Sequence, residues 1–194
     1  MDLQSIARFL FEVGMLRRTE RSGFRFLGSG RQSVAEHILR VAYIGYVLSR
    51  LEKGVDTEKL LKMCLFHDLC EARTGDLNYV HKRYVKADEE KAVADMAKEL
   101  FFGPELKEIL REFSQRSTRE AHLASDADQL DMILELKEQK DLGNRYASDW
   151  LPFVRGRLLT DPGRNLARTI LETDWSDWWF RRDDDWWVNA DNQR

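Results

Sequence analysis

The chain has 194 residues, of which 43% are hydrophobic and 34% are charged, and its formal net charge is −3 at pH 7. These values are typical of a globular protein with one core, because the chain is short for two domains. The acidic balance argues against a nucleic-acid polymer as the main partner. No apolar run approaches the ~20 residues of a membrane span. We therefore expect one domain that binds a small anionic molecule.

The two cysteines, Cys64 and Cys70, lie six residues apart in one apolar stretch. In a regular helix this spacing separates them by about 120° of rotation and ~9 Å of rise, which is too far for a disulfide. The first residues, Met1 to Gln4, lack the basic region and the long apolar segment of a secretory signal. We expect reduced thiols and a cytoplasmic protein.

Hydrophobic residues recur at helical spacing along most of the chain. No stretch of useful length alternates as a strand would, and there is no internal repeat or low-complexity linker. The helices predicted in chain order cover residues 3–13, 33–51, 56–74, 88–101, 104–113, 117–142 and 161–171. The sequence thus predicts a single all-α domain, a helical bundle over residues 1–174.

Two of these helices begin with a capping-box pattern, in which a serine and a glutamate three residues later satisfy each other's backbone N–H groups. Ser33 and Glu36 form one pattern, and Ser117 and Glu120 form the other. Residues 15–31 are basic and contain several glycines, so we expect a loop there.

The last segment, residues 175–194, is rich in tryptophan and carries an acidic run after two arginines. So much aromatic surface is costly to leave in water. We expect this tail to pack on the domain or on a second subunit. The alternative is that the tryptophans form an aromatic cage that binds a ligand.

The adjacent pair His67-Asp68 follows a strongly apolar run, where an aspartate is costly to bury without a partner. Neighbouring residues on a helix point about 100° apart, so the pair can share a metal ion only if other helices supply further ligands. Glu71 is four residues after His67 and three after Asp68, so its side chain heads toward the same patch. Asp76 follows the helix stop at 74–75.

The further ligands have to come from other helices. His37 lies near the start of its helix on the predicted buried side, where a lone histidine is more often a core residue than a ligand. Downstream, Asp126 and Asp128 lie on one helix but on different faces. Asp126 is four residues after His122 and forms a rival pair with it, and spacing alone does not decide between the two aspartates.

Three segments together resemble the HD-domain 5′-deoxynucleotidases, a family of all-α phosphohydrolases. They are residues 33–37 (Ser-Val-Ala-Glu-His), residues 67–77 (His-Asp-Leu-Cys-Glu-Ala-Arg-Thr-Gly-Asp-Leu) and residues 127–130 (Ala-Asp-Gln-Leu). The extended H-D-x-x-E-x-x-T-G-D stretch is far more specific than a bare His-Asp dipeptide. The resemblance runs from the first helix to about Leu142 and implies an HD-domain helical bundle with a metal site between its helices.

The resemblance also implies the ligands of that metal. Carried over by position, they are His37, His67, Asp68 and Asp128. Two imidazoles and two carboxylates suit Mn²⁺, Co²⁺, Fe²⁺ or Zn²⁺, whereas Mg²⁺ prefers oxygen ligands and suits them less well.

The resemblance assigns three further roles. Glu71 corresponds to the general base that orients a water, Asp76 to a residue on the sugar and leaving-group side, and Arg18 to a phosphate-binding arginine. Bacterial relatives have a tryptophan after that arginine, thought to favour 2′-deoxyribose, whereas this chain has Thr19. Phe24 is a candidate substitute for the tryptophan. Three other arginines of the loop are alternative phosphate contacts, namely Arg17, Arg21 and Arg25.

These residues predict a metal-dependent phosphomonoesterase that hydrolyses (deoxy)nucleoside 5′-monophosphates to nucleoside and phosphate. The alternatives are an HD phosphohydrolase acting on a nucleoside triphosphate, an alarmone or another phosphate ester, and a non-catalytic nucleotide- or metal-binding module. The family resemblance and the apolar tail favour a homodimer.

Overall fold

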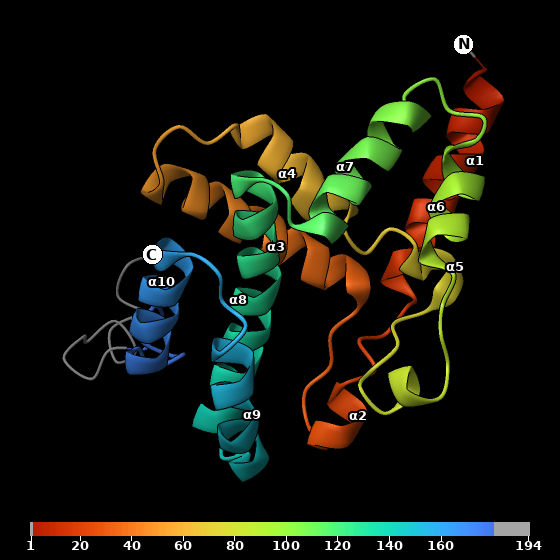
Figure 1. Ribbon diagram of the computed structural model, residues 1–194. Helices are drawn as coiled ribbons and strands as arrows, with labels where there is room; N and C mark the ends of the chain where they lie inside the picture. Colours follow the sequence, from red (N-terminus) through yellow and green to blue (C-terminus); the bar gives the residue numbers. More distant parts are fainter. Residues whose placement is uncertain (1, 181–194) are drawn as a thin grey trace, which may run out of the picture.

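The computed structural model describes residues 2–180, and within them the fold is all-α, as predicted (Figure 1). The one β-type contact in this part of the chain is an isolated bridge between Glu20 and Ser33. The elements are α1 (Leu3–Val13), the 3₁₀ turn η1 (Gly14–Arg17), α2 (Phe24–Leu27), α3 (Val34–Leu51), α4 (Thr57–Phe66), α5 (Glu71–Thr74), the 3₁₀ turn η2 (His81–Arg83), α6 (Glu89–Ala97), α7 (Gly103–Gln115), α8 (Arg119–Asp141), α9 (Arg145–Arg155) and α10 (Asp161–Glu172).

Helix α8 is the axis of the fold and contacts α3, α4, α7, α9 and α10. Figure 1 shows it running through the middle of the molecule with α3 crossing it. It buries side chains on every side, including three leucines with at most 1% exposure, Leu123, Leu130 and Leu136. Its buried residues include polar and charged ones, Asp126, Asp131 and Glu135 among them, so the surrounding helices enclose it on every side. Any polar residue of α8 that points inward therefore has to find partners on the surrounding helices.

The buried hydrophobic side chains form two clusters. The main core joins α3, α4, α8, α9 and α10, with Leu48, Leu60 and Leu130 fully buried. The N-terminal core joins α1, η1, α6 and α7 to the start of α3 and to Leu69. Helix α3 belongs to both, because Ile38 packs in the N-terminal core and Val41 in the main core. His37 therefore lies where the two clusters meet.

The prediction of one helix over residues 56–74 was wrong. Helix α4 ends at Phe66, a turn covers residues 67–70, and the short helix α5 follows. Leu69, which is 1% exposed, anchors the turn in the N-terminal core, and its N–H bonds to the carbonyl oxygen of Phe66 at 2.9 Å. The turn changes the direction of the chain directly after α4, at the His67-Asp68 pair.

Other boundaries also differ from the predictions. Ser33 and Glu36 form the predicted capping box, but α8 is capped by the hydroxyl of Thr118, which accepts from the N–H of Ala121, and not by Ser117. The expected loop over residues 15–31 contains η1 and α2. Helix α9 was not predicted at all. It begins at the Asn144 cap and continues through Pro152.

The tail is described only in part. The backbone N–H of Trp175 bonds to Asp141 at 3.1 Å, and the rings of Trp175 and Trp179 meet edge to face at 5.9 Å. Trp178 is 84% exposed. The predictions for Trp186 and Trp187 lie outside the described residues. No helix in residues 2–180 combines the length and the apolar character needed to cross a bilayer.

Candidate metal centre and active site

The turn after α4 places His67 and Asp68 on one side of the chain. The N–H of His67 makes the last α4 hydrogen bond, to the Met63 carbonyl oxygen at 3.0 Å. The Nδ1 atom of His67 lies 3.0 Å from the Cys64 carbonyl oxygen. A hydrogen bond from Nδ1–H to that carbonyl fixes the orientation of the ring. The lone pair of Nε2 then points toward the interior, where it can bind a metal. Because the helix has ended, Asp68 turns toward the same point instead of 100° away from it.

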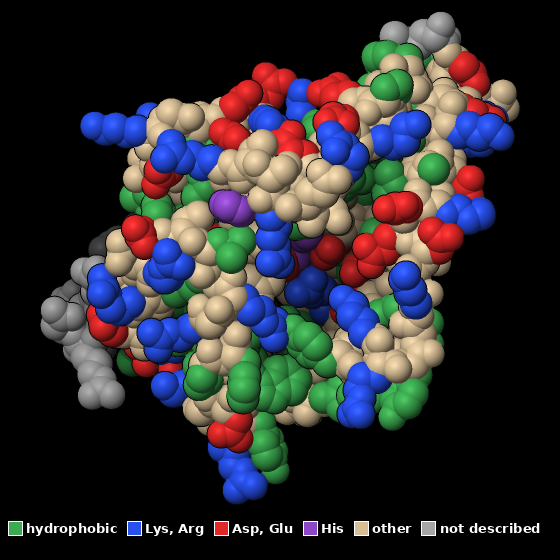
Figure 2. Space-filling model, in the orientation of Figure 1, with side chains coloured by type: hydrophobic (Ala, Val, Ile, Leu, Met, Phe, Trp, Pro, Cys, Tyr) green, Lys and Arg blue, Asp and Glu red, His purple; other side chains and the backbone are tan. Residues whose placement is uncertain are grey.

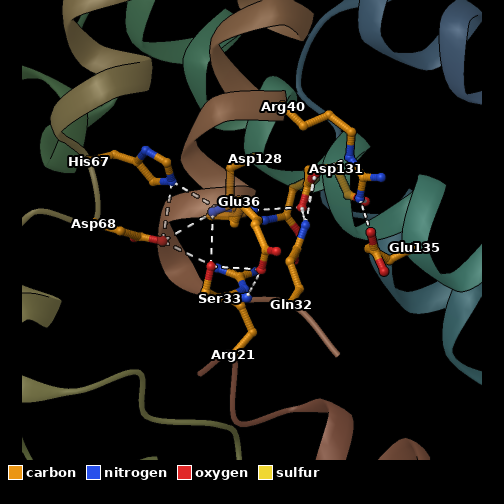
Figure 3. A network of polar contacts seen from close by, with 12 residues as sticks. Arg21, Gln32, Ser33, Glu36, Arg40, His67, Asp68, Asp128, Asp131 and Glu135 are labelled. Carbon is orange, nitrogen blue, oxygen red and sulfur yellow. Dashed lines mark hydrogen bonds and ion pairs between the residues drawn. The ribbon is translucent and has the colours of Figure 1, made fainter. Parts of the chain in front are cut away.

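His37, His67 and Asp128 come together around that point, and Asp68 lies beside the two histidines; Figure 3 labels His67, Asp68 and Asp128. The His37 Nε2 atom lies 3.2 Å from His67 Nε2, 3.4 Å from Asp68 Oδ2 and 3.3 Å from Asp128 Oδ1. His67 Nε2 lies 3.3 Å from Asp68 Oδ2. Ligand atoms bound to one ion at about 2.0–2.1 Å are themselves separated by about 3.0–3.4 Å. The ligand atoms of His37, His67 and Asp128 all lie within 4.8 Å of one another, which suits a single divalent cation between α3, the turn after α4, and α8, and Asp68 lies within reach of both histidines.

A carboxylate behind His37 holds that ring in place. Asp131 is fully buried, and its Oδ2 lies 2.6 Å from His37 Nδ1. Gln32 donates to the same carboxylate at 3.1 Å, and Arg40 bridges it to Glu135. A hydrogen-bonded carboxylate behind a histidine directs the other ring nitrogen toward a metal and raises the basicity of the ring. The sequence analysis did not assign this role to Asp131, although its position three residues after Asp128 on α8 puts both on neighbouring faces.

The open choice between Asp126 and Asp128 is resolved by their surroundings. Asp128 faces His37 and lines the cavity described below. Asp126 is fully buried on another face of α8, where it accepts from Leu159 N at 2.7 Å and Thr160 N at 2.9 Å. The rival pair with His122 is therefore not supported, because the carboxylate of Asp126 faces the start of α10.

The charges of the cluster match a cation. Burial, followed by the negative charges of Asp68 and Asp76, raises the pKa of Glu71 to about 9. Burial and the Arg21 cation lower the pKa of His37, but contacts with three carboxylates outweigh both and hold it well above its usual value. The carboxylates around His37 and the Asp68 and Asp76 charges near Glu71 contribute to these shifts, and a divalent ion would offset this negative charge.

Of the three other predicted site residues, two lie in the cavity lining and one does not. Glu71 and Asp76 both line the cavity. The Oε2 atom of Glu71 is buried and has no hydrogen-bond partner among the described residues. Asp76 accepts from the Ser22 N–H at 2.6 Å, which ties it to the loop before α2. Arg18 is exposed and does not line the cavity.

The arginine at the site is Arg21, which the sequence analysis listed only as an alternative. Its side chain is 12% exposed, and Nη1 lies 3.2 Å from Asp68 Oδ2. The backbone N–H of Arg21 bonds to the Gln32 carbonyl oxygen at 2.9 Å, next to the bridge between Glu20 and Ser33. This backbone pairing joins the two ends of the loop and directs the Arg21 side chain inward. The amino-acid composition of the loop does not predict the pairing, so the sequence alone did not single out Arg21.

These residues form one end of a cavity of about 610 Å³. Figure 2 shows a hollow in the middle of this face, with acidic and basic side chains around it and hydrophobic side chains below it. The far end is mainly apolar, and its largest side chains are Phe24, Phe26, Met132, Trp150 and Phe153. The cavity therefore combines a charged end, suited to a metal and an anion, with an apolar end suited to a flat hydrophobic group.

The fold and the site define a member of a known class. A profile of the HD domain matches residues 13–166, and the chain belongs to the HD-domain family. One relative is 5′-deoxynucleotidase HDDC2 of Mus musculus, which is 30% identical over 146 residues covering 72% of each chain. The protein of the same name from Dictyostelium discoideum is 31% identical over 149 residues, covering 70% of this chain and 78% of that protein.

Solved structures show the same fold. A conserved hypothetical protein from Pyrococcus furiosus superposes with a TM-score of 0.72 at 30% identity, covering 86% of this chain and 99% of that one. A protein from Magnetospirillum magnetotacticum, described as a predicted metal-dependent phosphohydrolase, has a TM-score of 0.69 over 88% of this chain and 91% of that one. At 22% identity, this second likeness concerns the fold alone.

Proposed function

We propose that the chain is a metal-dependent phosphomonoesterase that hydrolyses (deoxy)nucleoside 5′-monophosphates. The observation that carries the proposal is the meeting of two histidines with Asp68 and Asp128, which line a cavity together with Glu71, whose Oε2 has no hydrogen-bond partner among the described residues. The names of the curated relatives, 5′-deoxynucleotidases, support the reaction.

We assign the metal to His37, His67, Asp68 and Asp128. This mixed set of imidazole and carboxylate ligands favours Mn²⁺, Co²⁺, Fe²⁺ or Zn²⁺ over Mg²⁺. When bound, such an ion polarises a phosphate oxygen and lowers the pKa of a water molecule that attacks phosphorus.

The chain's own side chains supply the remaining steps. A bound cation would offset the neighbouring negative charges and lower the pKa of Glu71, and the ionised Glu71 would then accept the proton of the attacking water on Oε2, which is buried and has no hydrogen-bond partner among the described residues. Arg21 binds the phosphate with its guanidinium, which already faces the site beside Asp68. Asp76 orients the sugar or protonates the leaving 5′-oxygen from its place on the Ser22 loop. Arg18, assigned to the phosphate by resemblance, is in our proposal replaced by Arg21.

The cavity favours a nucleoside monophosphate over a polyphosphate. Its lining contains three cationic side chains, Arg21, Lys82 and Arg157. Arg21 is engaged with Asp68, and Arg157 lies over the Tyr79 ring. A single phosphate needs fewer cationic partners than the several phosphates of a triphosphate or an alarmone, and a nucleobase suits the apolar part of the lining. Thr19 does not line the cavity and Phe24 does, so Phe24 is the aromatic side chain placed to contact the sugar.

The test is release of inorganic phosphate from purified protein with Mn²⁺ or Co²⁺. We expect turnover of 5′-monophosphates, little of triphosphates, and none after chelation of the metal. Comparing ribo- and deoxynucleotides of each base determines the sugar preference. Tight metal or nucleotide binding without hydrolysis of any ester would instead support the non-catalytic module.

We also propose that the domain spans residues 1–174 and that it acts as a homodimer in the cytoplasm. Leu39, Tyr43 and Val47 are 60%, 68% and 44% exposed and follow one another at four-residue intervals along α3. Such a stripe on one helix face is suited to a second copy. Cys64 and Cys70 are both buried free thiols, which suits a reducing compartment. Sedimentation of wild type and Tyr43→Glu tests the dimer, and unchanged mass in the variant counts against this face.

A further inference from the structure

The two oxygens of Asp128 have different partners. Oδ1 faces His37 Nε2 at 3.3 Å, whereas Oδ2 accepts from Gln129 Nε2 at 2.7 Å. Gln129 is the next residue of α8 and also lines the cavity. By occupying one oxygen, its amide leaves the other to face the histidines. The orientation of Asp128 therefore depends on the orientation of the Gln129 amide.

A second side chain fixes that amide. Arg157 Nη1 donates to Gln129 Oε1 at 3.3 Å. An amide whose oxygen accepts from a guanidinium has to present its NH₂ group on the opposite side, here toward Asp128. Arg157 lies two residues beyond α9, and its backbone N–H bonds to the Val154 carbonyl oxygen at 3.1 Å. The helix absent from the sequence prediction thus places the arginine that orients a metal-ligand neighbour.

Arg157 also reaches across the cavity. Its guanidinium carbon lies 4.9 Å from the centre of the Tyr79 ring, within the range of a cation–π contact. Tyr79 follows Asn78, which donates to Ser22 Oγ at 3.1 Å and accepts from the N–H groups of Val80 and His81. The segment that carries Tyr79 is therefore held to the same loop whose Ser22 N–H donates to Asp76.

We propose that Tyr79, Arg157 and Gln129 form a relay that closes the cavity over the leaving group and orients Asp128 toward the metal. The inference rests on the proposed function, because it concerns the same metal and substrate. Gln129 is a positioning residue for the metal ligand. Arg157 has two roles, since it orients Gln129 and covers the substrate's apolar group between Tyr79 and α9.

The relay predicts separate effects for its two ends. Gln129→Met keeps the length of the side chain but loses both hydrogen bonds, so Co²⁺ affinity should fall by about 10-fold to 100-fold, as is usual when a partner of a metal ligand is lost. The absorption spectrum of the Co²⁺-loaded protein should also change. Gln139→Met is the matched control, because Gln139 is a buried glutamine of α8 that bonds to Ser29 at 2.6 Å, away from the cavity.

Arg157→Met should raise KM for a nucleoside monophosphate several-fold more than KM for glycerol phosphate, which has no base to cover. Arg157→Lys keeps the positive charge but lacks the planar guanidinium, so its KM for the nucleoside monophosphate should lie between those of wild type and Arg157→Met. The measurements are Co²⁺ competition against a chelating dye, the visible spectrum and steady-state kinetics on the full chain.

Equal Co²⁺ affinity and identical spectra for Gln129→Met and Gln139→Met would overturn the relay. Equal rises in KM for both esters in Arg157→Met would overturn the covering role. If the wild-type protein hydrolyses no ester, the proposed function fails, while the Co²⁺ measurements still decide whether Gln129 orients a ligand.

Discussion

Asp126 and Asp128 lie two residues apart on α8, yet their carboxylates face different surroundings. Asp126 is fully buried and accepts three hydrogen bonds, from Leu159 N, Thr160 N and Thr160 Oγ1. Asp128 has a side chain that is 24% exposed, faces His37 and lines a cavity. Two residues on a helix are separated by about 200° of rotation, which sends one toward α10 and the other toward the histidines.

The difference separates a structural carboxylate from one that we propose as a metal ligand. The charge of Asp126 is satisfied by donors from one loop, so it needs nothing from solution. Asp128 instead lines a cavity together with Asp68 and with Glu71, whose Oε2 has no partner among the described residues, and a cation nearby would offset this negative charge. The number and kind of protein donors, rather than burial, distinguish the two roles.

The largest expected effect is that of Asp128→Ala. Metal affinity should fall by at least about 100-fold and phosphate release should drop to background, because a direct ligand is lost. In wild type, metal at 100 times Kd should add about 2.7 kcal/mol to the free energy of unfolding, and the variant should lose this gain. Calorimetric titration and thermal melts with and without Mn²⁺ measure both. A variant that still binds metal as wild type does would contradict the ligand assignment.

Glu71→Gln should lower kcat by about 10²-fold to 10⁴-fold, because it removes a general base while keeping the shape of the side chain. Metal affinity should change little, since Glu71 is not among the four proposed ligands. Single-turnover rates and a metal titration on the same preparation separate the two quantities. Loss of metal together with rate would instead make Glu71 a ligand.

Asp126→Ala should cost about 3 kcal/mol of unfolding free energy, because two backbone N–H groups and a hydroxyl lose a charged acceptor. Its metal stoichiometry should stay that of wild type. Urea unfolding provides the measurement. Asp161→Ala is the control, because that side chain is 87% exposed at the start of α10 and its removal should cost less than about 1 kcal/mol. Loss of metal in Asp126→Ala would revive the rival site.

Gly163→Ala should cost about 1–2 kcal/mol, since a Cβ there would lie 2.2 Å from Asp126 Oδ2 and push that carboxylate aside. Gly156→Ala is the matched control. Its Cβ would meet nothing closer than the Pro152 carbonyl oxygen at 3.5 Å, so the substitution should be neutral or slightly stabilising. Equal unfolding free energies for the two variants would show that Asp126 tolerates displacement.

Much of the fold could be predicted because most helices have a clear apolar stripe and a cap. The stripe of α1 and the capping box of Ser33 and Glu36 are examples. The break after Phe66 could not be predicted, because Leu69 continues the apolar pattern of α4 although it packs in the N-terminal core and not in the main core. Helix α9 was missed although Ala147, Leu151 and Val154 follow helical spacing, because Pro152 stands inside it.

The four proposed ligand positions followed from the resemblance, and His37, His67 and Asp128 lie together in the structure, with Asp68 beside the two histidines. Spacing alone left Asp126 and Asp128 equivalent, since only the contacts around α10 distinguish them. The role of Arg21 among several arginines of one loop depends on the backbone pairing of residues 20–21 with residues 32–33. Asp131, Gln129 and Arg157 act through other side chains, and such roles require coordinates.

The position of His37 between the two hydrophobic cores has a mechanical consequence. A cation bound there would join α3 and α8 of the main core to the turn that Leu69 anchors in the N-terminal core. Binding would then slow amide hydrogen exchange in α1 and α6, which supply no ligand, as well as in α8. The metal would then stabilise the packing of the two hydrophobic cores against each other, in addition to its part in the chemistry.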